Sequence, residues 1–251
     1  MERLLYKYRP WDDRTKDILT SHRLYIPTPA EFNDPFDCRP AFVFSASKNR
    51  KKAKLREIQR EGRLDYIVRA SSREINMLAR SPAFSESLTQ SANHHWNVGL
   101  PRLGVLCLTA VPDNILMWSH YAESHNGICI GFDASPNTLF GQAKAVSYSK
   151  QYPSFNHITQ DMNEAVELVL RKAQEWSYEQ EFRLIGKRDV QFMQFPPAFV
   201  RTVIMGCSMP SSHKAEVRSL LRARAMPVTI FEARKAEGEF RLDLIEAEKI
   251  T

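Results

Sequence analysis

The chain has 251 residues, of which 43% are hydrophobic and 10% are aromatic, and its formal net charge is +6. A chain of this length and apolar content can bury a sizeable core, which excludes an intrinsically disordered protein. No segment approaches the roughly 20 apolar residues of a membrane span, and the charged stretch MERLLYKYRPWDD is unlike a signal peptide, so we expect a soluble, cytoplasmic protein with no membrane partner.

The first predicted elements are short. Apolar and β-branched residues predict strands at 4–9 (LLYKYR) and 23–29 (RLYIPTP). Between them, the stretch 12–22 (DDRTKDILTSH) predicts a helix, because carboxylates in a first helical turn suit the helix dipole.

The stretch AEFNDPFD at 30–37 predicts a turn. Asn33 or Asp34 can bond back to the backbone in an Asx-turn, and Pro35 fixes the next backbone angle. Asn33 and Asp34 can instead line a ligand cleft, so both interpretations stay open. Asp34 and Asp37 lack the further carboxylates that a hard cation needs, and the histidines show no zinc spacing, so we expect no metal site.

Residues from about 45 to 98 form a predicted helical insertion with a strong positive charge. Gly62 and the serines at 71 and 72 are expected to divide it into several helices. Between Lys48 and Arg80, eleven basic residues stand against four acidic ones, whereas the rest of the chain is nearly neutral. This pattern is typical either of a surface that binds a polyanion such as nucleic acid or of a helical face with solubilising charges.

The second half of the chain predicts more strands with helices between them. Asp113 is expected to cap a helix that ends at Gly127 in a left-handed conformation. Further helices are predicted at 160–176 and 211–225. Strands are predicted at 102–110, 128–133, 143–149, 176–186, 199–206, 227–234 and 239–247. The lack of strict alternation indicates an α+β fold with mixed or antiparallel sheets, in one domain spanning 1–251 with the helical basic insertion at about 45–98.

The four cysteines, at positions 38, 107, 129 and 207, show no paired spacing. Cys107 and Cys129 lie in apolar, strand-like runs. We therefore expect buried thiols in a reducing compartment.

The stretch WSYEQEFRLIG at 176–186 carries the main candidate chemistry. If it is a strand, alternation puts Glu179, Glu181 and Arg183 in one row, each about 7 Å from the next. Two neighbouring carboxylates repel each other, and one guanidinium relieves that repulsion only in part. The row is therefore either a functional site or the solvated face of an antiparallel strand.

The order of the motifs FNDPFD, MWSHYA and EQEFR, together with LLYKYR near the start, resembles the bacterial domain of unknown function 2971 family. The resemblance covers most of the chain outside residues 45–98. It implies membership of that family and does not by itself imply an activity.

More distantly, the layout is similar to the ADP-ribosyltransferase fold. Those enzymes bind NAD in a cleft of a split β-core, with a His or Arg on the first strand, a hydroxyl residue on a middle strand and a Glu on a late strand. The matching positions here are Lys7 or Arg9, then Thr109, then Glu179 and Glu181 in EQE. The first strand has no His, and Thr109 is not followed by a Ser-Thr-Ser pattern, so these positions depart from the family pattern.

This second resemblance implies a role for each carboxylate. Glu181 would hold the ribose 2′-hydroxyl of NAD and stabilise the oxocarbenium-like transition state. Glu179 would position or deprotonate the acceptor. The cofactor-binding candidates are Arg9 or Arg183 for the pyrophosphate, Tyr8, Trp118 and Tyr121 as aromatic platforms, and Lys7, Thr109 and Asn33 along the cleft.

The resulting hypothesis is an NAD-dependent ADP-ribosyltransferase-like intracellular toxin or anti-phage effector. The alternative is a non-catalytic nucleic-acid-binding defence or regulatory module that uses the basic segment Lys48–Arg80. A hydrolase acting on nucleic acid is a weaker alternative, because the sequence shows no carboxylate cluster for a metal and no nucleophile beside a base. The oligomeric state stays open.

Overall fold

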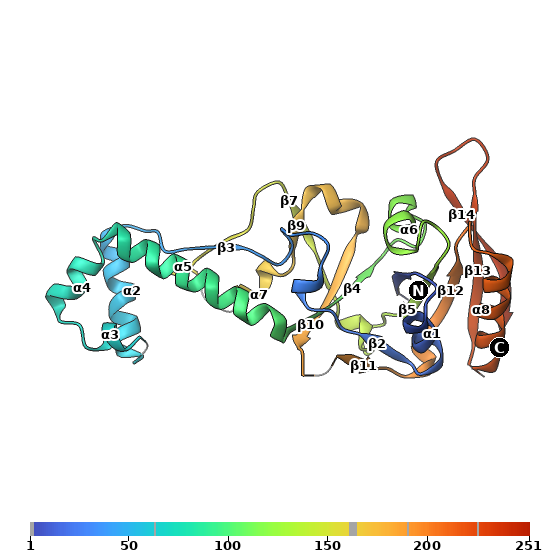
Figure 1. Ribbon diagram of the computed structural model, residues 1–251, viewed down its shortest axis with the longest axis horizontal. Coiled ribbons are helices and arrows are strands. Elements are labelled where there is room, and N and C mark those ends of the chain that lie inside the picture. The colour runs from blue at the N-terminus through green and yellow to red at the C-terminus, as the bar shows by residue number, and fades with distance from the viewer. Residues whose placement is uncertain (1–2, 63, 161–164, 190, 225) are drawn as a thin grey trace. The chain divides into compact units, whose positions relative to one another are not determined.

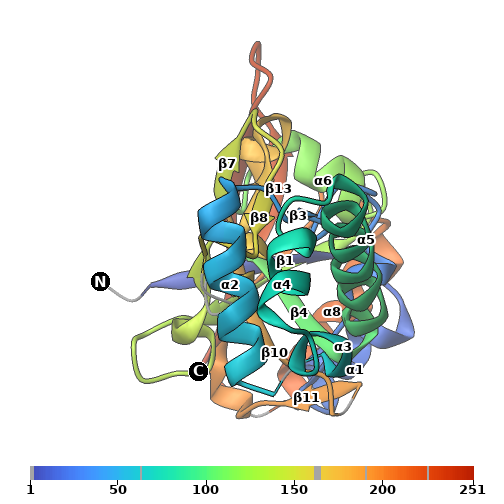
Figure 2. The ribbon, with the colours of Figure 1, turned by 90° about the vertical axis from the view of Figure 1, so that its left-hand side faces the viewer.

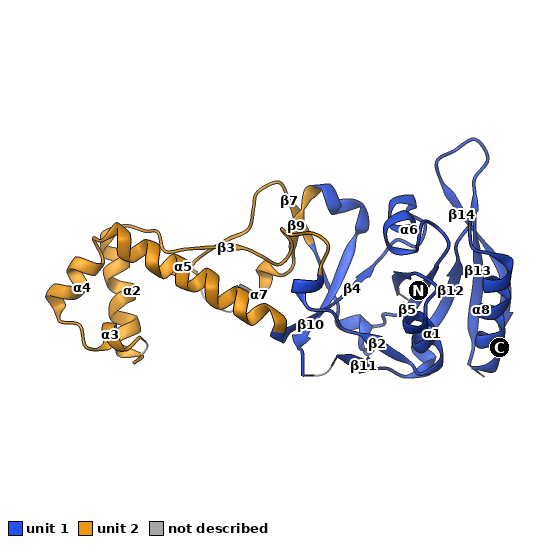
Figure 3. Ribbon diagram, in the orientation of Figure 1, with its two compact units in different colours: residues 1–31, 102–146, 175–251 blue, residues 32–101, 147–174 orange. Residues whose placement is uncertain are grey.

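The computed structural model describes residues 3–62, 64–160, 165–189, 191–224 and 226–251. They form two units, shown in different colours in Figure 3. Unit 1 comprises residues 1–31, 102–146 and 175–251, and unit 2 comprises residues 32–101 and 147–174. No helix in the described ranges is both long and apolar enough to cross a membrane.

Unit 1 is built on an eight-stranded sheet with the order β14-β13-β12-β5-β1-β4-β10-β6 (Figure 1). The pairing of β12 with β13 is parallel and the other described pairings within this sheet are antiparallel. The fold is therefore mixed α/β with a mostly antiparallel sheet. The strands are β1 (Leu4–Arg9), β4 (Leu103–Thr109), β5 (Ile128–Asp133), β6 (Lys144–Ala145), β10 (Glu181–Lys187), β12 (Val200–Met205), β13 (Val228–Lys235) and β14 (Leu242–Ile250). A separate two-stranded sheet pairs β2 (Arg23–Tyr25) with β11 (Phe192–Gln194).

Helices cover both faces of the large sheet, because alternate residues of its strands are apolar on each side. On one face, α1 (Asp13–Thr20) and α8 (Ser211–Ala223) bury Leu19 and Leu221 against the sheet. On the other face, α6 (Ile115–Tyr121) buries Trp118 against Tyr8 and Cys129. We call this second side the α6 face.

Unit 2 contains the predicted helical insertion. Its helices are α2 (Lys48–Arg60), α3 (Asp65–Val68), α4 (Ser72–Leu78), α5 (Pro82–Gly99) and α7 (Ala165–Leu168). Figure 2 looks onto α2 to α5, which enclose a small apolar core that includes Leu55, Ile67 and Ile75. Two short parallel pairs, β3 (Ala41–Val43) with β8 (Ser154–Asn156) and β7 (Ser147–Ser149) with β9 (Arg171–Ala173), complete the unit.

The predicted breaks in the insertion are confirmed. Helix α2 ends at Arg60, just before Gly62, whose φ of 68° suits glycine. Helix α4 begins after Ser71, whose hydroxyl accepts from the Glu74 amide while the Glu74 carboxylate accepts from the Ser71 amide. This reciprocal capping box explains why a new helix starts at that position.

The predicted ends of α6 are wrong. Its N-cap is Asn114 rather than Asp113, because the Asn114 side chain accepts from the amides of Leu116 and Met117. The left-handed residues after the helix are positions 123, 124 and 125 rather than Gly127. Gly127 instead allows the backbone to pass close to Arg9, since a Cβ at position 127 would lie 2.1 Å from the Arg9 carbonyl oxygen.

The predicted helix at 160–176 is also wrong over its second half. Residues 161–164 lie outside the described ranges, α7 ends at Leu168, and residues 171–173 pair with β7 as strand β9. A 3₁₀ helix follows at Gln174–Glu179, and β10 begins only at Glu181. The predicted strand at 176–186 therefore holds only in its later part, because Gln180 adopts a left-handed φ of 41° that interrupts an extended chain.

Candidate functional site

Three strands that carry candidate residues lie side by side in the sheet, in the order β1-β4-β10. Tyr6 pairs directly with Thr109, and Thr109 pairs directly with Glu181. Residues directly opposite each other in antiparallel strands share one face of a sheet. The sheet therefore carries a row of Tyr6, Thr109 and Glu181 on the α6 face, and we call it the Glu181 row.

Glu181 and Arg183 form a buried ion pair. Arg183 Nε donates to Glu181 Oε1 at 2.8 Å, and Arg183 Nη2 donates to Glu181 Oε2 at 2.9 Å. Glu181 is 4% exposed and Arg183 is 1% exposed. The interpretation of these charges as a solvated strand face is therefore wrong. A carboxylate that accepts from two nitrogens of one guanidinium is fixed in orientation.

Glu179 is the second buried carboxylate, at 3% exposure. It lies at the end of the 3₁₀ helix rather than on β10, and Gln180 turns the chain between the two glutamates. The Tyr121 hydroxyl of α6 donates to Glu179 Oε1 at 2.7 Å. The Thr109 hydroxyl donates to the Glu179 carbonyl oxygen, which ties the turn to β4. Tyr121, Thr109 and both glutamates are thus brought together.

Tyr8 and Trp118 are core residues on the same face. Their rings pack edge to face with centroids 5.2 Å apart, and Trp118 is fully buried. The Tyr8 hydroxyl donates to the Val111 carbonyl at 2.8 Å, and the Trp118 indole donates to the Pro112 carbonyl at 2.9 Å. Burial raises the pKa of Tyr8 above its ordinary value. Of the three aromatic candidates, Tyr121 is the one that contacts a candidate carboxylate.

The side chains of Lys7 and Arg9 leave β1 on the face opposite to α6. Lys7 pairs with Ile130 and Arg9 pairs with Ile128, and both isoleucines lie in the core on that face. Lys7 Nζ donates to the Cys107 carbonyl at 3.0 Å, and burial lowers the pKa of Lys7 to about 8. Arg9 Nε donates to the Thr15 hydroxyl at 3.3 Å, and its guanidinium lies 3.6 Å from the Asp12 carboxylate. Arg9 therefore stabilises the start of α1. Neither residue is a member of the Glu181 row, but the charge of Glu181 acts on Lys7 and raises its pKa against the effect of burial.

Tyr6 is the member of the row that the sequence reasoning missed. Its half-buried ring lies over Gly131, where a Cβ would be 2.9 Å from Tyr6 Cε1. Burial raises the pKa of Tyr6, and the groups of Cys129 and Asp113 add to the effect. The alternation of LLYKYR does contain the signal, because it separates Tyr6 from Lys7 and Arg9.

Asn33 lies in unit 2 and is exposed. The backbone amide of Phe36 donates to Asp34 Oδ1 at 2.9 Å, which confirms the predicted Asx-turn. Asp37 is buried, 3.9 Å from Lys172 Nζ. These contacts give the FNDPFD stretch a structural role within unit 2.

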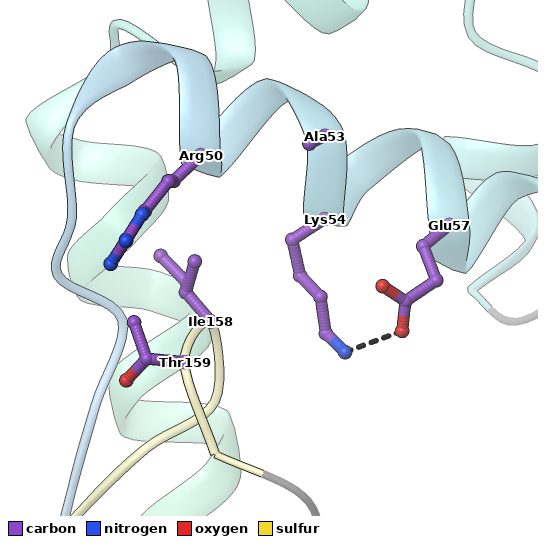
Figure 4. A pocket seen from close by; sticks show the side chains of 6 residues that line it. All are labelled: Arg50, Ala53, Lys54, Glu57, Ile158 and Thr159. Carbon is purple, nitrogen blue, oxygen red and sulfur yellow. Dashed lines mark hydrogen bonds and ion pairs between the residues drawn. The ribbon is translucent and has the colours of Figure 1, made fainter.

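Unit 2 also has an open depression of about 330 Å³ beside α2 (Figure 4). Its lining residues are Arg50, Ala53, Lys54, Glu57, Ile158 and Thr159. Lys54 Nζ lies 2.5 Å from Glu57 Oε1, so one of its two cations is already paired. In the ranges that the structure describes, no group of three or more His, Cys, Asp or Glu side chains is placed to hold a metal ion.

Comparison with known proteins matches one family. The family model described as "Protein of unknown function (DUF2971)" matches residues 117–184, a stretch that runs from α6 into β10 and includes Glu179, Glu181 and Arg183. Comparisons with curated proteins and with solved structures give no match. Over residues 117–184, this chain is therefore similar to the DUF2971 family of proteins of unknown function.

Proposed function

We propose that unit 1 is an NAD-dependent ADP-ribosyltransferase-like enzyme in which Glu181 is the catalytic carboxylate. The observation that carries this proposal is the Glu181 row, which brings a first-strand residue, a hydroxyl strand and a glutamate strand together as neighbours. The large sheet would then be the ADP-ribosyltransferase-like core. A cellular toxin or an anti-phage effector is the role that we propose for such an activity.

The electrostatics of Glu181 suit this chemistry. Cleavage of the nicotinamide–ribose bond releases neutral nicotinamide and leaves positive charge developing on the ribose ring. A fixed negative charge stabilises that charge more strongly in a water-poor site than in bulk water. Arg183 orients the Glu181 carboxylate through two hydrogen bonds.

We assign Glu179 to a different step. Its Oε1 accepts from the Tyr121 hydroxyl, so the carboxylate is held beside the end of β4. In the transfer step, an acceptor attacks the ribose carbon as the bond to nicotinamide breaks, and the acceptor's proton passes to Glu179. Tyr121 therefore acts as a positioning residue for this base.

The test is release of nicotinamide from labelled NAD by the purified protein, alone and with added RNA, DNA or cell lysate. Glu181→Gln removes the charge while it keeps the shape, and we expect at least a 100-fold loss of release. Glu175→Gln is the matched control, because Glu175 is an exposed glutamate in the same 3₁₀ helix. Glu179→Gln should reduce transfer to the acceptor more than it reduces hydrolysis of NAD.

Two results would contradict the proposal. The first is the absence of release in every mixture together with no thermal shift on addition of NAD. The second is equal loss of activity in Glu175→Gln and Glu181→Gln while both remain folded. Either result would leave Glu181 and Arg183 as a structural ion pair.

A second candidate function rests on unit 2. We propose that the basic segment binds nucleic acid, because Lys48, Arg50, Arg56 and Arg60 are all exposed on the single helix α2. The exposed ring of Tyr66 in α3 adds a surface on which a base can stack. Binding that depends on these cations and not on Glu181 would mark a non-catalytic module.

A further inference from the structure

Cys207 and His125 form a thiol–imidazole pair in unit 1 that shares no residue with the Glu181 row. Cys207 follows β12 and His125 lies in the loop between α6 and β5. The Cys207 Sγ lies 3.7 Å from His125 Nδ1, within hydrogen-bonding reach for sulfur, and both residues are partly exposed. A nucleophile beside a base is the basic unit of covalent catalysis.

Backbone hydrogen bonds hold the two loops together. The Ser208 amide donates to the His125 carbonyl at 3.1 Å, and the Gly206 amide donates to the Gly127 carbonyl at 3.0 Å. Gly206 permits this approach, because a Cβ there would lie 2.1 Å from the His125 carbonyl oxygen. The spacing between thiol and imidazole is therefore set by the fold.

The loop that carries His125 has an unusual backbone. Residues 123, 124 and 125 all have positive φ, at 50°, 51° and 69°, and none of them is glycine. Such positions are costly and persist only where the surrounding structure enforces them. The His125 amide donates to the Trp118 carbonyl at 3.2 Å, and the imidazole stacks on the buried Trp118 ring with an interplanar angle of 12°. The strained backbone at residues 123–125 is therefore held in a conformation that fixes the position of the His125 imidazole.

The electrostatic surroundings favour a neutral imidazole that can accept a proton. Burial and the positive charge of Lys235 lower the pKa of His125 below its ordinary value. Burial raises the pKa of the Cys107 and Cys129 thiols well above the ordinary range, and Cys38 is buried. Cys207 therefore differs from the buried Cys38 and Cys129 in access, and from Cys107 in having an imidazole partner.

We propose that Cys207 is a nucleophilic thiol, with His125 as its base, and that its substrates are hydroperoxides. His125 Nδ1 takes the thiol proton, and the thiolate attacks the terminal peroxide oxygen. The oxygen–oxygen bond breaks, and the leaving oxygen takes the proton back from the imidazolium as water or an alcohol. Cys207 is oxidised to a sulfenic acid, and the hydroperoxide is reduced.

Hydroperoxides fit this pair better than acyl substrates do. Acyl transfer needs donors placed around a developing oxyanion, in addition to the nucleophile and the base. Reduction of a hydroperoxide needs a thiolate and a proton donor for the leaving oxygen, and the pair supplies both. The inference does not depend on the proposed NAD chemistry, since the two sites share no residue.

The experiment measures sulfenic acid formation with hydrogen peroxide and with an organic hydroperoxide, using a sulfenic-acid trapping reagent and peptide mapping by mass spectrometry. In the native protein, Cys207 should be trapped at least tenfold faster than Cys38, Cys107 and Cys129. His125→Asn should slow trapping at Cys207 about tenfold or more. Asparagine is chosen because it tolerates the left-handed backbone at this position.

His120→Asn is the matched control, because His120 is an exposed histidine on α6, and it should leave the trapping rate unchanged. Two results would overturn the proposal. One is trapping at Cys207 no faster than in a free thiol peptide, which needs no variant and so does not depend on the folding of any substitution. The other is an unchanged rate in a folded His125→Asn protein.

Discussion

At the scale of single residues, the main feature is a pair of opposite charges inside unit 1. Glu181 and Arg183 are two residues apart on β10 and share two hydrogen bonds while almost fully buried. Moving two ions out of water is expensive, and their mutual attraction seldom gives a net gain in stability over apolar residues. A buried ion pair that gives no net gain in stability is a candidate for function, because perturbed and buried charges cluster at functional sites.

Arg183→Met should lower the free energy of unfolding by about 3 kcal/mol or more, because it removes two hydrogen bonds from a carboxylate that stays buried. Urea unfolding followed by far-UV circular dichroism measures the change. Arg234→Met, at an exposed position on β13, is the control and should change stability by less than about 0.5 kcal/mol. The double variant Glu181→Gln with Arg183→Met should recover part of the loss, and a single-variant loss like that of the control would contradict the prediction.

The sequence identified most of the candidate site residues, but it did not predict the burial of several of them or which residues of β1 lie beside them. Alternation placed Glu181 and Arg183 on one face, and that face is confirmed. Their burial could not be predicted, because it depends on contacts with segments that are distant in the chain, such as the pairing of β10 with β4. The resemblance to the ADP-ribosyltransferase fold pointed to Lys7 or Arg9 as the basic residue of the first strand, whereas the register of β1 places Tyr6 in the row.

At the scale of elements, α6 connects the sheet to the candidate site. Asn114 begins the helix by accepting from the Leu116 and Met117 amides at 2.9 and 3.1 Å. Its Nδ2 also donates to the Tyr178 carbonyl at 3.4 Å in the 3₁₀ helix that carries Glu179. One side chain therefore fixes both the helix that provides Tyr121 and the turn that provides Glu179.

Asn114→Ala should lower the free energy of unfolding by about 1–2 kcal/mol, through loss of the cap and of the bond to Tyr178. Thermal and urea unfolding measure the loss. Asp113→Ala is the matched control, because Asp113 is exposed and adjacent and is not the cap, and it should have little effect. Asn114→Asp keeps the capping oxygen and should retain more stability than Asn114→Ala. Equal losses at positions 113 and 114 would show that the cap is assigned to the wrong residue.

At the scale of the whole molecule, the exposed cations proposed to bind nucleic acid and the candidate catalytic residues lie in different units. The exposed cations of α2 belong to unit 2, whereas Glu179, Glu181 and the Cys207–His125 pair belong to unit 1. Each of the described apolar cores also draws its residues from one unit alone. The two proposed functions can therefore be separated by substitutions on the surface of unit 2.

If α2 binds nucleic acid, replacing Lys48, Arg50, Arg56 and Arg60 with Gln should weaken binding and lower the slope of log affinity against log salt. Each lost phosphate contact is worth about 0.9 in that slope for duplex DNA. Fluorescence anisotropy with labelled DNA and RNA across a salt series measures it. The control replaces the exposed residues Arg102, Lys187, Arg234 and Lys249 of unit 1 with Gln, which removes the same charge. Equal weakening in both variants would mean that net charge alone attracts the polyanion.

The sequence by itself determined the local elements of this protein. Alternating apolar residues specified most strands, and caps such as Ser71 specified helix starts, because these signals act through neighbouring residues. Tertiary structure alone decided that β1, β4 and β10 are neighbours, that Gln180 turns the chain, and that Thr109 and Glu181 are buried. The reason is that strand pairing and burial depend on contacts between residues far apart in the chain, which no local pattern records.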